Sequence, residues 1–430
     1  MMRGGCAAVA IAVCLTATSA CGGGDGDDVD LDFEGEPGRA IPAAFDGWVP
    51  GVDASLDGSA ASHFLIDTGA PVTLVDTDDF SALAEGWHAL DLELGGLRFP
   101  GLEVGALDVF AYVQTQGEPF TGIIGGNILT SFALSLDYQG GRVWLEREPA
   151  DLPADLSADA VDAPIAIDAL VAGGGAFRVG GELREIGATR FLVRVAVEDQ
   201  ADEDGFWVLV DSGASSVVLD GRLLDSLGDQ GRPRLEGIAV GTAGGEQTAY
   251  LTRVWNLRVS QPPESGGDLA VEQASVAVLA LPDDTIFESI SDEVGADVRG
   301  ILGGMFLRRY AATIDYPGES LRLLPYREQD HIDPQEFTGV GFLVSPDGDD
   351  WVVTTVYPDT DAEAKGVAFG DVVAELDGAS LTGLAIDEVT ALFASYDVGD
   401  AAQVGLARGG AIEVLEVEVE DLLPEFEAPQ

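Results

Sequence analysis

The fold is decided by two stretches of the 430-residue chain, FLIDTGAPVTLVD at Phe64–Asp76 and VLVDSGASSVVLD at Val208–Asp220. In both, an apolar run leads into Asp-Thr/Ser-Gly-Ala, and a second β-rich run ends in Asp nine residues after the first Asp. The second copy lies 144 residues after the first. An apolar run that ends in Asp and Gly is typical of a strand entering a tight turn. Each stretch therefore predicts a strand, a turn and a second strand.

A second pair of matching stretches follows in the same order. IIGGNILTSFALSLDY at Ile123–Tyr138 matches ILGGMFLRRYAATIDY at Ile301–Tyr316 without gaps, 178 residues apart. Two blocks that repeat in one order indicate an internal duplication. The larger second offset means that the second copy holds about 34 more residues between its blocks. We therefore expect two homologous lobes.

Both copies have the composition of β-structure. Val, Ile, Leu and aromatic residues come in short runs broken by Gly, Pro and Asp, which predicts a mainly β fold. Ser135–Glu146 and Thr313–Leu324 are predicted hairpins with Gly-containing turns, and the residues after Gly126 and Gly304 could each form one or two helical turns.

The extra residues of the second copy contain a predicted long hairpin. Gly237–Val259 is β-rich about a central turn at Ala243, Gly244 and Gly245. Glycine permits a mobile tip with positive φ. We expect no equivalent hairpin in the first copy, where Trp87–Val109 is predicted to run directly from one short strand to the next.

Composition excludes several classes of function. Apolar residues make up 46% and charged residues 23%, as in a globular chain, and 76 acidic against 21 basic residues give a formal net charge of −55. Such a charge repels nucleic acids and strongly acidic substrates. Three histidines without metal-ligand spacing argue against a zinc hydrolase, and no G-x-S-x-G elbow is present. All three cysteines, Cys6, Cys14 and Cys21, fall in the N-terminal leader, so a cysteine nucleophile is excluded.

The remaining chemistry is that of carboxylates, and we expect no metal or cofactor. A carboxylate can act as a base that activates a water molecule, and a carboxylic acid can protonate an oxygen of a substrate. Two carboxyl groups that share one proton provide both, because like charges in contact cannot both ionise. A single Asp-Gly motif would more simply end a strand at a turn.

The paired motifs resemble the retropepsin-like aspartyl protease family, in which each lobe supplies Asp-Thr/Ser-Gly and a later apolar-apolar-Gly segment. The resemblance covers about residues 40 to 326 and implies two β-barrel lobes around one cleft. We expect one flap, not two, over that cleft, because the extra residues of the second copy include the Gly-tipped hairpin at Ala243, Gly244 and Gly245. The site residues that it implies are a catalytic pair, two bracing hydroxyl residues, two glycines of the sharp turns and two glycines packed against those turns: Asp67 and Asp211, Thr68 and Ser212, Gly69 and Gly213, Gly125 and Gly303.

Four other aspartates also repeat, and each could be read as a second catalytic acid: Asp76, Asp220, Asp137 and Asp315. They lack the adjoining Thr/Ser-Gly loop. We therefore expect structural or solvated roles for them. His63 and His88 have no repeated counterpart and are expected to be ordinary surface or half-buried residues.

The N-terminus is typical of an export signal. Residues 1–20 contain Arg3 followed by an apolar run too short to span a bilayer, and small residues precede Cys21. This ending resembles the lipobox of bacterial lipoproteins, which would make Cys21 a lipidated first residue; the alternative is a plain secretory signal cleaved near Ala20. Gly- and Asp-rich residues 21–39 predict a solvated tether. We expect a lipid-anchored protein of a bacterial cell envelope, at the outer membrane if the bacterium has two.

Residues 336–422 resemble a PDZ domain. Their pattern is GVGFLVS, a turn, the strand WVVTTVY, the segment AKGVAFGDVVAELDG and an amphipathic run at Ala385–Tyr396. Val340, Gly341 and Phe342 match the loop in which PDZ domains capture a chain terminus by backbone N–H groups. As an alternative, the module only packs on the lobes.

The sequence thus predicts a signal peptide (1–20), a tether (21–39), two protease lobes (40–150 and 151–330) and an α+β PDZ domain (336–422). The predicted activity is that of an aspartic endopeptidase acting on polypeptides, with a protein C-terminus or peptide as a second partner at the PDZ domain. An inactive peptide-binding scaffold is the alternative. The apparent lack of a first-lobe flap favours the scaffold, and the intact Asp-Thr-Gly and Asp-Ser-Gly favour the enzyme.

Overall fold

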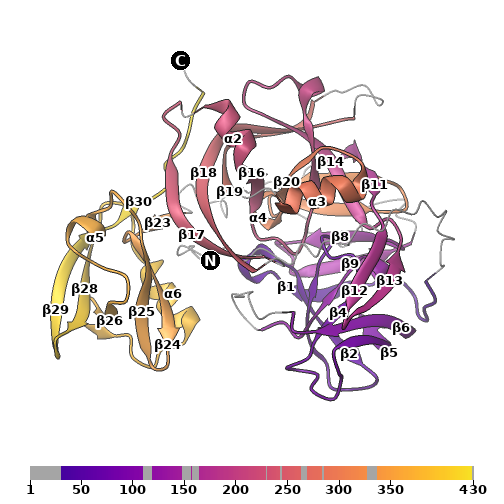
Figure 1. The fold of residues 1–430 in the computed structure, drawn as a ribbon, viewed down its shortest axis with the longest axis horizontal. Coiled ribbons are helices and arrows are strands. Elements are labelled where there is room, and N and C mark those ends of the chain that lie inside the picture. The colour runs from indigo at the N-terminus through magenta and orange to yellow at the C-terminus, as the bar shows by residue number, and fades with distance from the viewer. Residues whose placement is uncertain are drawn as a thin grey trace.

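The protein is mainly β in the computed structural model (Figure 1). The structure describes residues 31–109, 119–147, 156, 164–228, 230–242, 245–262, 269–282, 285–326 and 337–428. The predicted signal peptide, Cys21 and His331 lie outside these residues, as do residues 21–30 of the predicted tether. The prediction of a solvated tether is wrong for its described part, because Leu31 and Phe33 pack against the apolar core and Glu34 forms a β-bridge with Arg98. The strand content confirms the predicted class, which followed from short apolar runs punctuated by Gly, Pro and Asp.

The first repeat folds into a closed ring of six strands. Their order around the ring is β2-β3-β7-β4-β6-β5, and pairing of β2 with β5 closes it. The ring alternates buried and exposed side chains along its longer strands, which places one face in the core. The strands are β2 (Gly51–Leu56), β3 (Ser62–Ile66), β4 (Leu74–Asp76), β5 (Gly86–Leu94), β6 (Leu97–Leu107) and β7 (Gly122–Ile124).

The second repeat forms a ring of the same order, β14-β15-β20-β16-β19-β18, closed by pairing of β14 with β18. In both rings, the strand that follows the Asp loop pairs in parallel with a later strand, β4 with β6 in the first and β16 with β19 in the second. The duplication of sequence is thus matched by a duplication of strand order. The strands are β14 (Arg190–Val197), β15 (Phe206–Val210), β16 (Val217–Asp220), β18 (Gly245–Ser260), β19 (Leu269–Leu281) and β20 (Val298–Leu302), with β11 (Leu170–Ala172) and β17 (Arg234–Thr242) added at the ends of the sheet.

Six strands join the two repeats in the order β10-β22-β21-β8-β9-β1. At the centre, β8 and β21 pair antiparallel with Ser135 opposite Thr313, and the two hydroxyl oxygens lie 2.8 Å apart. One apolar core continues across this junction and includes Phe64 and Val208 from the two rings. The strands are β1 (Ile41–Ala44), β8 (Ala133–Asp137), β9 (Arg142–Glu146), β10 (Ile165–Asp168), β21 (Tyr310–Asp315) and β22 (Ser320–Pro325).

Several local predictions are confirmed. β8 with β9 and β21 with β22 are the two expected hairpins. A single helical turn follows each Gly-Gly pair, at α1 (Gly126–Leu129) and α4 (Gly304–Leu307). β17 and β18 form the expected long hairpin, whose pairing closes with Thr242 opposite Gly245; the predicted flap residues Ala243 and Gly244 lie outside the described residues.

One prediction is wrong: the first repeat does contain a hairpin between Trp87 and Val109. β5 and β6 pair along their length and turn at Gly95 and Gly96, which have φ of +58° and +89°. Two left-handed residues in succession form the tight turn that suits a hairpin. About half of the extra length of the second repeat is α2 (Gly221–Leu227) with β17, inserted before the matching hairpin, and most of the rest is the greater length of β18–β19 compared with β5–β6.

A further hairpin, β12 (Gly175–Val179) with β13 (Glu182–Ile186), precedes the second ring but packs on the first. Phe177 and Val179 are buried in a cluster with Ala70 and Val72, which follow the first Asp-Thr-Gly. The segment between the repeats thus contributes to the support of the first Asp loop. Short 3₁₀ turns lie at η1 (Asp46–Trp48) and η2 (Asp202–Asp204), and the longer helix α3 (Thr285–Val294) precedes β20.

The C-terminal residues fold around a core of their own, which includes Val353 and Leu406. In Figure 1 this unit lies to the left of the two rings. Phe337, Tyr357 and Leu423 nevertheless pack into the second ring's cluster, and Arg253 of β18 donates to the Leu423 carbonyl at 2.8 Å. The elements are β23 (Thr338–Gly339), β24 (Phe342–Asp347), β25 (Asp350–Val356), α5 (Asp361–Ala364), β26 (Val372–Leu376), β27 (Ala379–Ser380), α6 (Ile386–Phe393), β28 (Ala401–Arg408), β29 (Ala411–Glu418) and β30 (Glu420–Asp421).

Candidate active site

Each Asp-Thr/Ser-Gly lies in the turn that leaves the second strand of its ring. Asp67 follows β3, and its Oδ1 accepts hydrogen bonds from the backbone N–H of Gly69 at 2.7 Å and Ala70 at 3.0 Å. Asp211 follows β15 and accepts from Gly213 at 2.9 Å and Ala214 at 3.1 Å. Both aspartates are 0% exposed. The turn thus fixes one oxygen of each carboxyl group and leaves Oδ2 free to face outward from its loop.

The two carboxyl groups meet between the rings. A methyl group added at Gly69 would lie 2.3 Å from Oδ2 of Asp211, and one at Gly213 would lie 2.4 Å from Cγ of Asp67. Only glycine fits at a backbone position this close to another group. The side chains of Asp67 and Asp211 lie within hydrogen-bonding reach of each other, and neither Oδ2 has an N–H or O–H donor among the described residues.

The hydroxyl residues of the two motifs cross-link the loops. Thr68 Oγ1 donates to the carbonyl of Val210 at 2.8 Å and accepts from the N–H of Ser212 at 2.9 Å. Reciprocally, Ser212 Oγ donates to the carbonyl of Ile66 at 2.8 Å and accepts from the N–H of Thr68 at 3.1 Å. Four buried hydrogen bonds therefore hold the two aspartates in one relative position.

Gly125 and Gly303 close against these loops. A methyl group at Gly125 would lie 2.3 Å from the carbonyl oxygen of Val72, and one at Gly303 would lie 2.3 Å from that of Ser216. The N–H of Gly126 donates to the carbonyl oxygen of Ala70 at 2.8 Å, and the N–H of Gly304 donates to that of Ala214 at 2.7 Å. Ala70 and Ala214 each follow the glycine of an Asp-Thr/Ser-Gly motif. The glycines are thus required for close packing, and the paired spacing seen in the sequence is the signal of it.

Burial and mutual repulsion control the protonation of the pair. Burial raises the pKa of Asp67 well above its ordinary value, and the nearby Asp211 carboxyl raises it further. Burial also raises the pKa of Asp211, whereas hydrogen bonds and the charge of Arg190 act in the opposite direction. Since both groups are short of water and close to each other, one proton is retained on the pair.

The sequence pattern gives no signal for two further residues at the site. Arg190 donates through Nη1 to the carbonyl oxygen of Gly69, and its side chain pairs with Glu293. Neither residue has a counterpart in the other repeat, so duplication could not reveal them.

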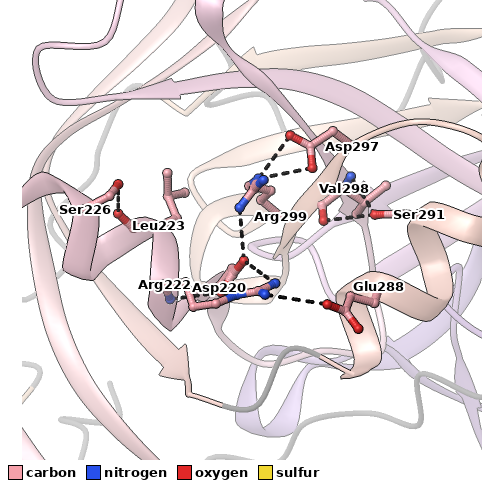
Figure 2. A network of polar contacts seen from close by, with 9 residues as sticks. All are labelled: Asp220, Arg222, Leu223, Ser226, Glu288, Ser291, Asp297, Val298 and Arg299. Carbon is pink, nitrogen blue, oxygen red and sulfur yellow. Dashed lines mark hydrogen bonds and ion pairs between the residues drawn. The ribbon is translucent and has the colours of Figure 1, made fainter.

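The other repeated aspartates lie in structural contacts. Figure 2 shows Asp220 between Arg222 and Arg299, and its Oδ1 caps α2 by accepting the Arg222 N–H at 2.9 Å. Asp76 accepts the N–H groups of Asp78 and Val109. Asp137 and Asp315 accept the N–H of a turn glycine and each pairs with an arginine of its hairpin. None of these contacts is to the Asp67 and Asp211 pair.

The two described histidines lie apart from the pair. His63 is buried and stacks on Phe120 with ring centroids 5.0 Å apart, and its Nδ1 is 3.5 Å from Asp53. His88 contacts the carbonyl oxygen of Ala84 at 2.7 Å. Over the described ranges, no cluster of three or more His, Cys, Asp or Glu side chains is arranged to hold a metal ion.

The predicted PDZ loop lies at the start of edge strand β24. Val340 and Phe342 are buried in the core of the C-terminal unit, so their side chains are not available to a ligand. Gly341 has φ of +78°, and a methyl group there would lie 2.6 Å from Oγ1 of Thr360. Phe342 packs edge-on against Phe393 of α6 with centroids 6.0 Å apart. Only backbone groups of this loop could serve a ligand.

Comparisons with known proteins agree with the site in the second repeat. Residues 193–306 match the aspartyl protease family model. The matched segment contains Asp211 and Gly303. The aspartic proteinase from Irpex lacteus is similar at 13% identity over 67% of this chain and 97% of that chain, with a TM-score of 0.41.

Two other solved structures are similar over shorter lengths. The photosystem II D1 C-terminal processing protease shares 28% identity over 20% of this chain and 24% of that chain, with a TM-score of 0.19. An aminopeptidase N family protein from Idiomarina loihiensis shares 21% identity over 20% and 14%, with a TM-score of 0.18. No curated protein matches the chain. Among the helices that the structure describes, none has the length and apolar character needed to cross a bilayer.

Proposed function

We propose that the protein is an aspartic endopeptidase that hydrolyses peptide bonds through Asp67 and Asp211. The observation that carries the proposal is the contact of two buried carboxyl groups on loops joined by four reciprocal hydrogen bonds. The match of residues 193–306 to aspartyl proteases supports it. In this reading the two rings are the lobes of the enzyme, with bounds at residues 40–150 and 151–330.

The protonation of the pair assigns the roles. We assign the shared proton to Asp67 and the carboxylate form to Asp211, because the positive charge of Arg190 favours the ionised form of Asp211 and lowers its pKa against the effect of burial. The water oxygen attacks the peptide carbonyl carbon while Asp211 accepts a proton from that water. At the same time, Asp67 donates its proton to the carbonyl oxygen. The C–N bond of the resulting diol then breaks as the proton held by Asp211 passes to the leaving nitrogen. The Asp67 carboxylate recovers a proton from the second diol hydroxyl.

The hairpin β17–β18 is proposed as a flap, with its tip at Ala243, Gly244 and Gly245. Closing a hairpin over the substrate would exclude water and order the peptide. Deletion of the tip should lower peptide turnover far more than it lowers the melting temperature, since a turn buries little apolar surface. Normal turnover after deletion would contradict this assignment.

The C-terminal unit is proposed to be a PDZ domain of residues 336–422 that binds a peptide or protein C-terminus. Edge strand β24 pairs only with β25 in its sheet, so its other edge is open to an added strand among the described elements. Since the Val340 and Phe342 side chains are buried, recognition would rest on backbone groups about Gly341. The competing function of this unit is purely structural. The packing of Phe337, Tyr357 and Leu423 on the second ring favours it.

An inactive peptide-binding scaffold is a second candidate function. The observation in its favour is that Asp67 and Asp211 are both 0% exposed. The apparent lack of a first-lobe hairpin does not favour the scaffold, because β5 and β6 of the first ring form such a hairpin.

The test separates the two candidates. Asp67→Asn and Asp211→Asn should each abolish cleavage of an unstructured casein-like substrate, whereas Asp220→Asn, with a repeated aspartate outside the pair, should retain it. A pepstatin-type inhibitor should bind the wild type and block its activity. Substantial cleavage by either pair variant would overturn the aspartic mechanism, and a folded wild type without activity from pH 3 to pH 8 would favour the scaffold.

A further inference from the structure

A buried ion pair lies directly behind the first Asp loop. The side chain of Arg190, the first residue of β14, is 0% exposed, and the side chain of Glu293 in α3 is 2% exposed. Arg190 Nε donates to Glu293 Oε1 and Nη2 donates to Oε2, both at 3.0 Å. A bidentate pair of this kind fixes the plane and direction of the guanidinium group.

The third nitrogen of that guanidinium group contacts the other repeat. Nη1 of Arg190 donates to the carbonyl oxygen of Gly69. The N–H of the same glycine donates to Oδ1 of Asp67 at 2.7 Å. The peptide groups on both sides of the Gly69 Cα are therefore held, and this Cα is the one that lies against Oδ2 of Asp211. Arg190 thus helps to fix the position of Asp67 relative to Asp211.

This contact breaks the twofold likeness of the site. Gly126 of the first repeat closes against Thr189, and Gly304 of the second closes against Trp48, so Thr189 and Trp48 occupy matching places. The residues that follow them are Arg190 in one case and the apolar Val49 in the other. The duplicated fold therefore does not itself require an arginine here.

Stability gives no ready reason for the pair. Taking two charges out of water costs about as much free energy as their attraction returns, so a buried ion pair adds little net stability. It does fix geometry, and it places a positive charge in a region of low dielectric, where charges act strongly on their neighbours.

We infer that Arg190 is a positioning residue for the Asp67 and Asp211 pair, holding the Gly69 carbonyl and keeping a positive charge, moderated by Glu293, beside Asp211. This inference rests on the proposed peptidase function. It predicts two separable effects, one from the grip on the carbonyl and one from the charge.

Among the residues that the structure describes, the other titratable and charged groups that act on the pair or on its neighbours are Tyr138, Tyr316 and Arg308. Tyr316 donates to the Thr68 carbonyl at 3.3 Å, and the charges of Arg308 and Asp211 both act on Tyr138. Burial raises the pKa of both tyrosines and lowers the pKa of Arg308 to about 10. These three groups keep one charge state below pH 8, whereas the charge of Arg190 lowers the pKa of Asp211 against the effect of burial. The carboxyl group of Glu293 pairs with Arg190. Glu293→Gln removes its negative charge.

The experiment compares Arg190→Met, Arg190→Lys and Glu293→Gln by pH profiles of kcat and kcat/KM on a peptide substrate. Arg190→Met should lower kcat by about tenfold to a hundredfold through misplacement of the loop, with KM little changed, and should move the acid limb to higher pH. Arg190→Lys keeps the charge and should lower kcat without moving the limb. Glu293→Gln should move the limb to lower pH, since the charge of Arg190 is then no longer offset.

The matched control is Arg232→Met, which breaks a second buried pair, Arg232 with Glu198, in the same repeat but outside the strands of its ring. Arg232 makes bonds to Glu198 at 2.6 and 2.9 Å and none of its described contacts is to an Asp loop. Equal losses of kcat and an unmoved acid limb in Arg190→Met and Arg232→Met would overturn the inference, as would movement of the limb in one direction by both Arg190→Met and Glu293→Gln.

A readout without catalysis separates this inference from the proposed function. In carboxyl ¹³C titrations, the signals of the pair are those lost in Asp67→Asn and Asp211→Asn. Arg190→Met should move the ionisation of the pair to higher pH whether or not peptides are cleaved. If the wild type cleaves no peptide, the proposed function fails, and an unmoved titration would independently refute the electrostatic role of Arg190.

Discussion

Asp67→Asn should abolish cleavage and yet stabilise the folded protein near neutral pH. The side chain of Asp67 is fully buried, its Oδ1 accepts two backbone N–H groups, and its other oxygen faces Asp211. Asparagine keeps the acceptor at Oδ1 and presents an amide N–H toward Asp211. It therefore imitates the protonated form of Asp67 at every pH.

The magnitude follows from proton linkage. Burial and Asp211 raise the pKa of Asp67 in the folded protein. A raised pKa contributes stability that is fully present below the unfolded pKa, about 3.9, and is lost as pH rises toward the folded pKa. Within that window the wild type should lose about 1.4 kcal/mol of unfolding free energy per pH unit relative to the variant. Each kcal/mol corresponds to a melting temperature change of about 2–4 °C for a unit of 150–250 residues.

The assay is thermal and chemical unfolding of both proteins from pH 3 to pH 8. The two curves should coincide near pH 3 and diverge as pH rises, with the variant the more stable. Asp199→Asn, which removes one charge at an exposed position, controls for the general effect of net charge. A difference between wild type and Asp67→Asn that is independent of pH, or a variant less stable at pH 7, would refute this reasoning.

Four further outcomes are expected. Thr68→Val strands the Val210 carbonyl and the Ser212 N–H and should cost about 2–4 kcal/mol of unfolding free energy by denaturant titration; an unchanged midpoint would contradict the role of the hydroxyl. Gly304→Ala should cost about 3 kcal/mol or prevent folding, since its Cβ would lie 2.0 Å from the Trp48 carbonyl oxygen, and soluble yield and circular dichroism report it. Asp220→Asn should lower the melting temperature through loss of the α2 cap and its ion pairs while kcat stays within about twofold. Cys21→Ser should move the protein from the membrane fraction to the soluble fraction, because only the proposed lipid would anchor the tether.

The pair of Asp loops could be predicted from the sequence because duplication supplies its own control. A lone Asp-Thr-Gly is a common turn, but two copies with a second matched block imply that both are held in equivalent surroundings. Gly125 and Gly303 could be predicted from the same repetition, because a side chain at either position would clash with the loop that it packs against. The cross-linking by Thr68 and Ser212 came from the family resemblance rather than from spacing.

What the sequence did not reveal is what occurs only once. Arg190 and Glu293 lie 103 residues apart in the chain and meet only after the rings have formed. The β5–β6 hairpin turns at Gly95 and Gly96, whereas the excess residues of the second repeat favoured a hairpin at Gly237–Val259 alone. The β12–β13 hairpin likewise had a turn signal in Gly180 and Gly181, but its packing on the first ring depends on tertiary contacts.

The strand pairing at the centre of the molecule has a consequence for how such a chain could arise. Strands β8 and β21 pair antiparallel about Ser135 and its repeat counterpart Thr313. Ala133 faces Asp315, which is the counterpart of Asp137, and Asp137 faces Ala311, which is the counterpart of Ala133. The edge that one repeat presents is therefore complementary to itself. A polypeptide of a single repeat would carry an open edge able to pair with the same edge of a second copy, as in a symmetric dimer. Fusion of two such copies makes that association independent of concentration and leaves each half free to diverge, which is the condition under which a one-sided residue such as Arg190 can be acquired.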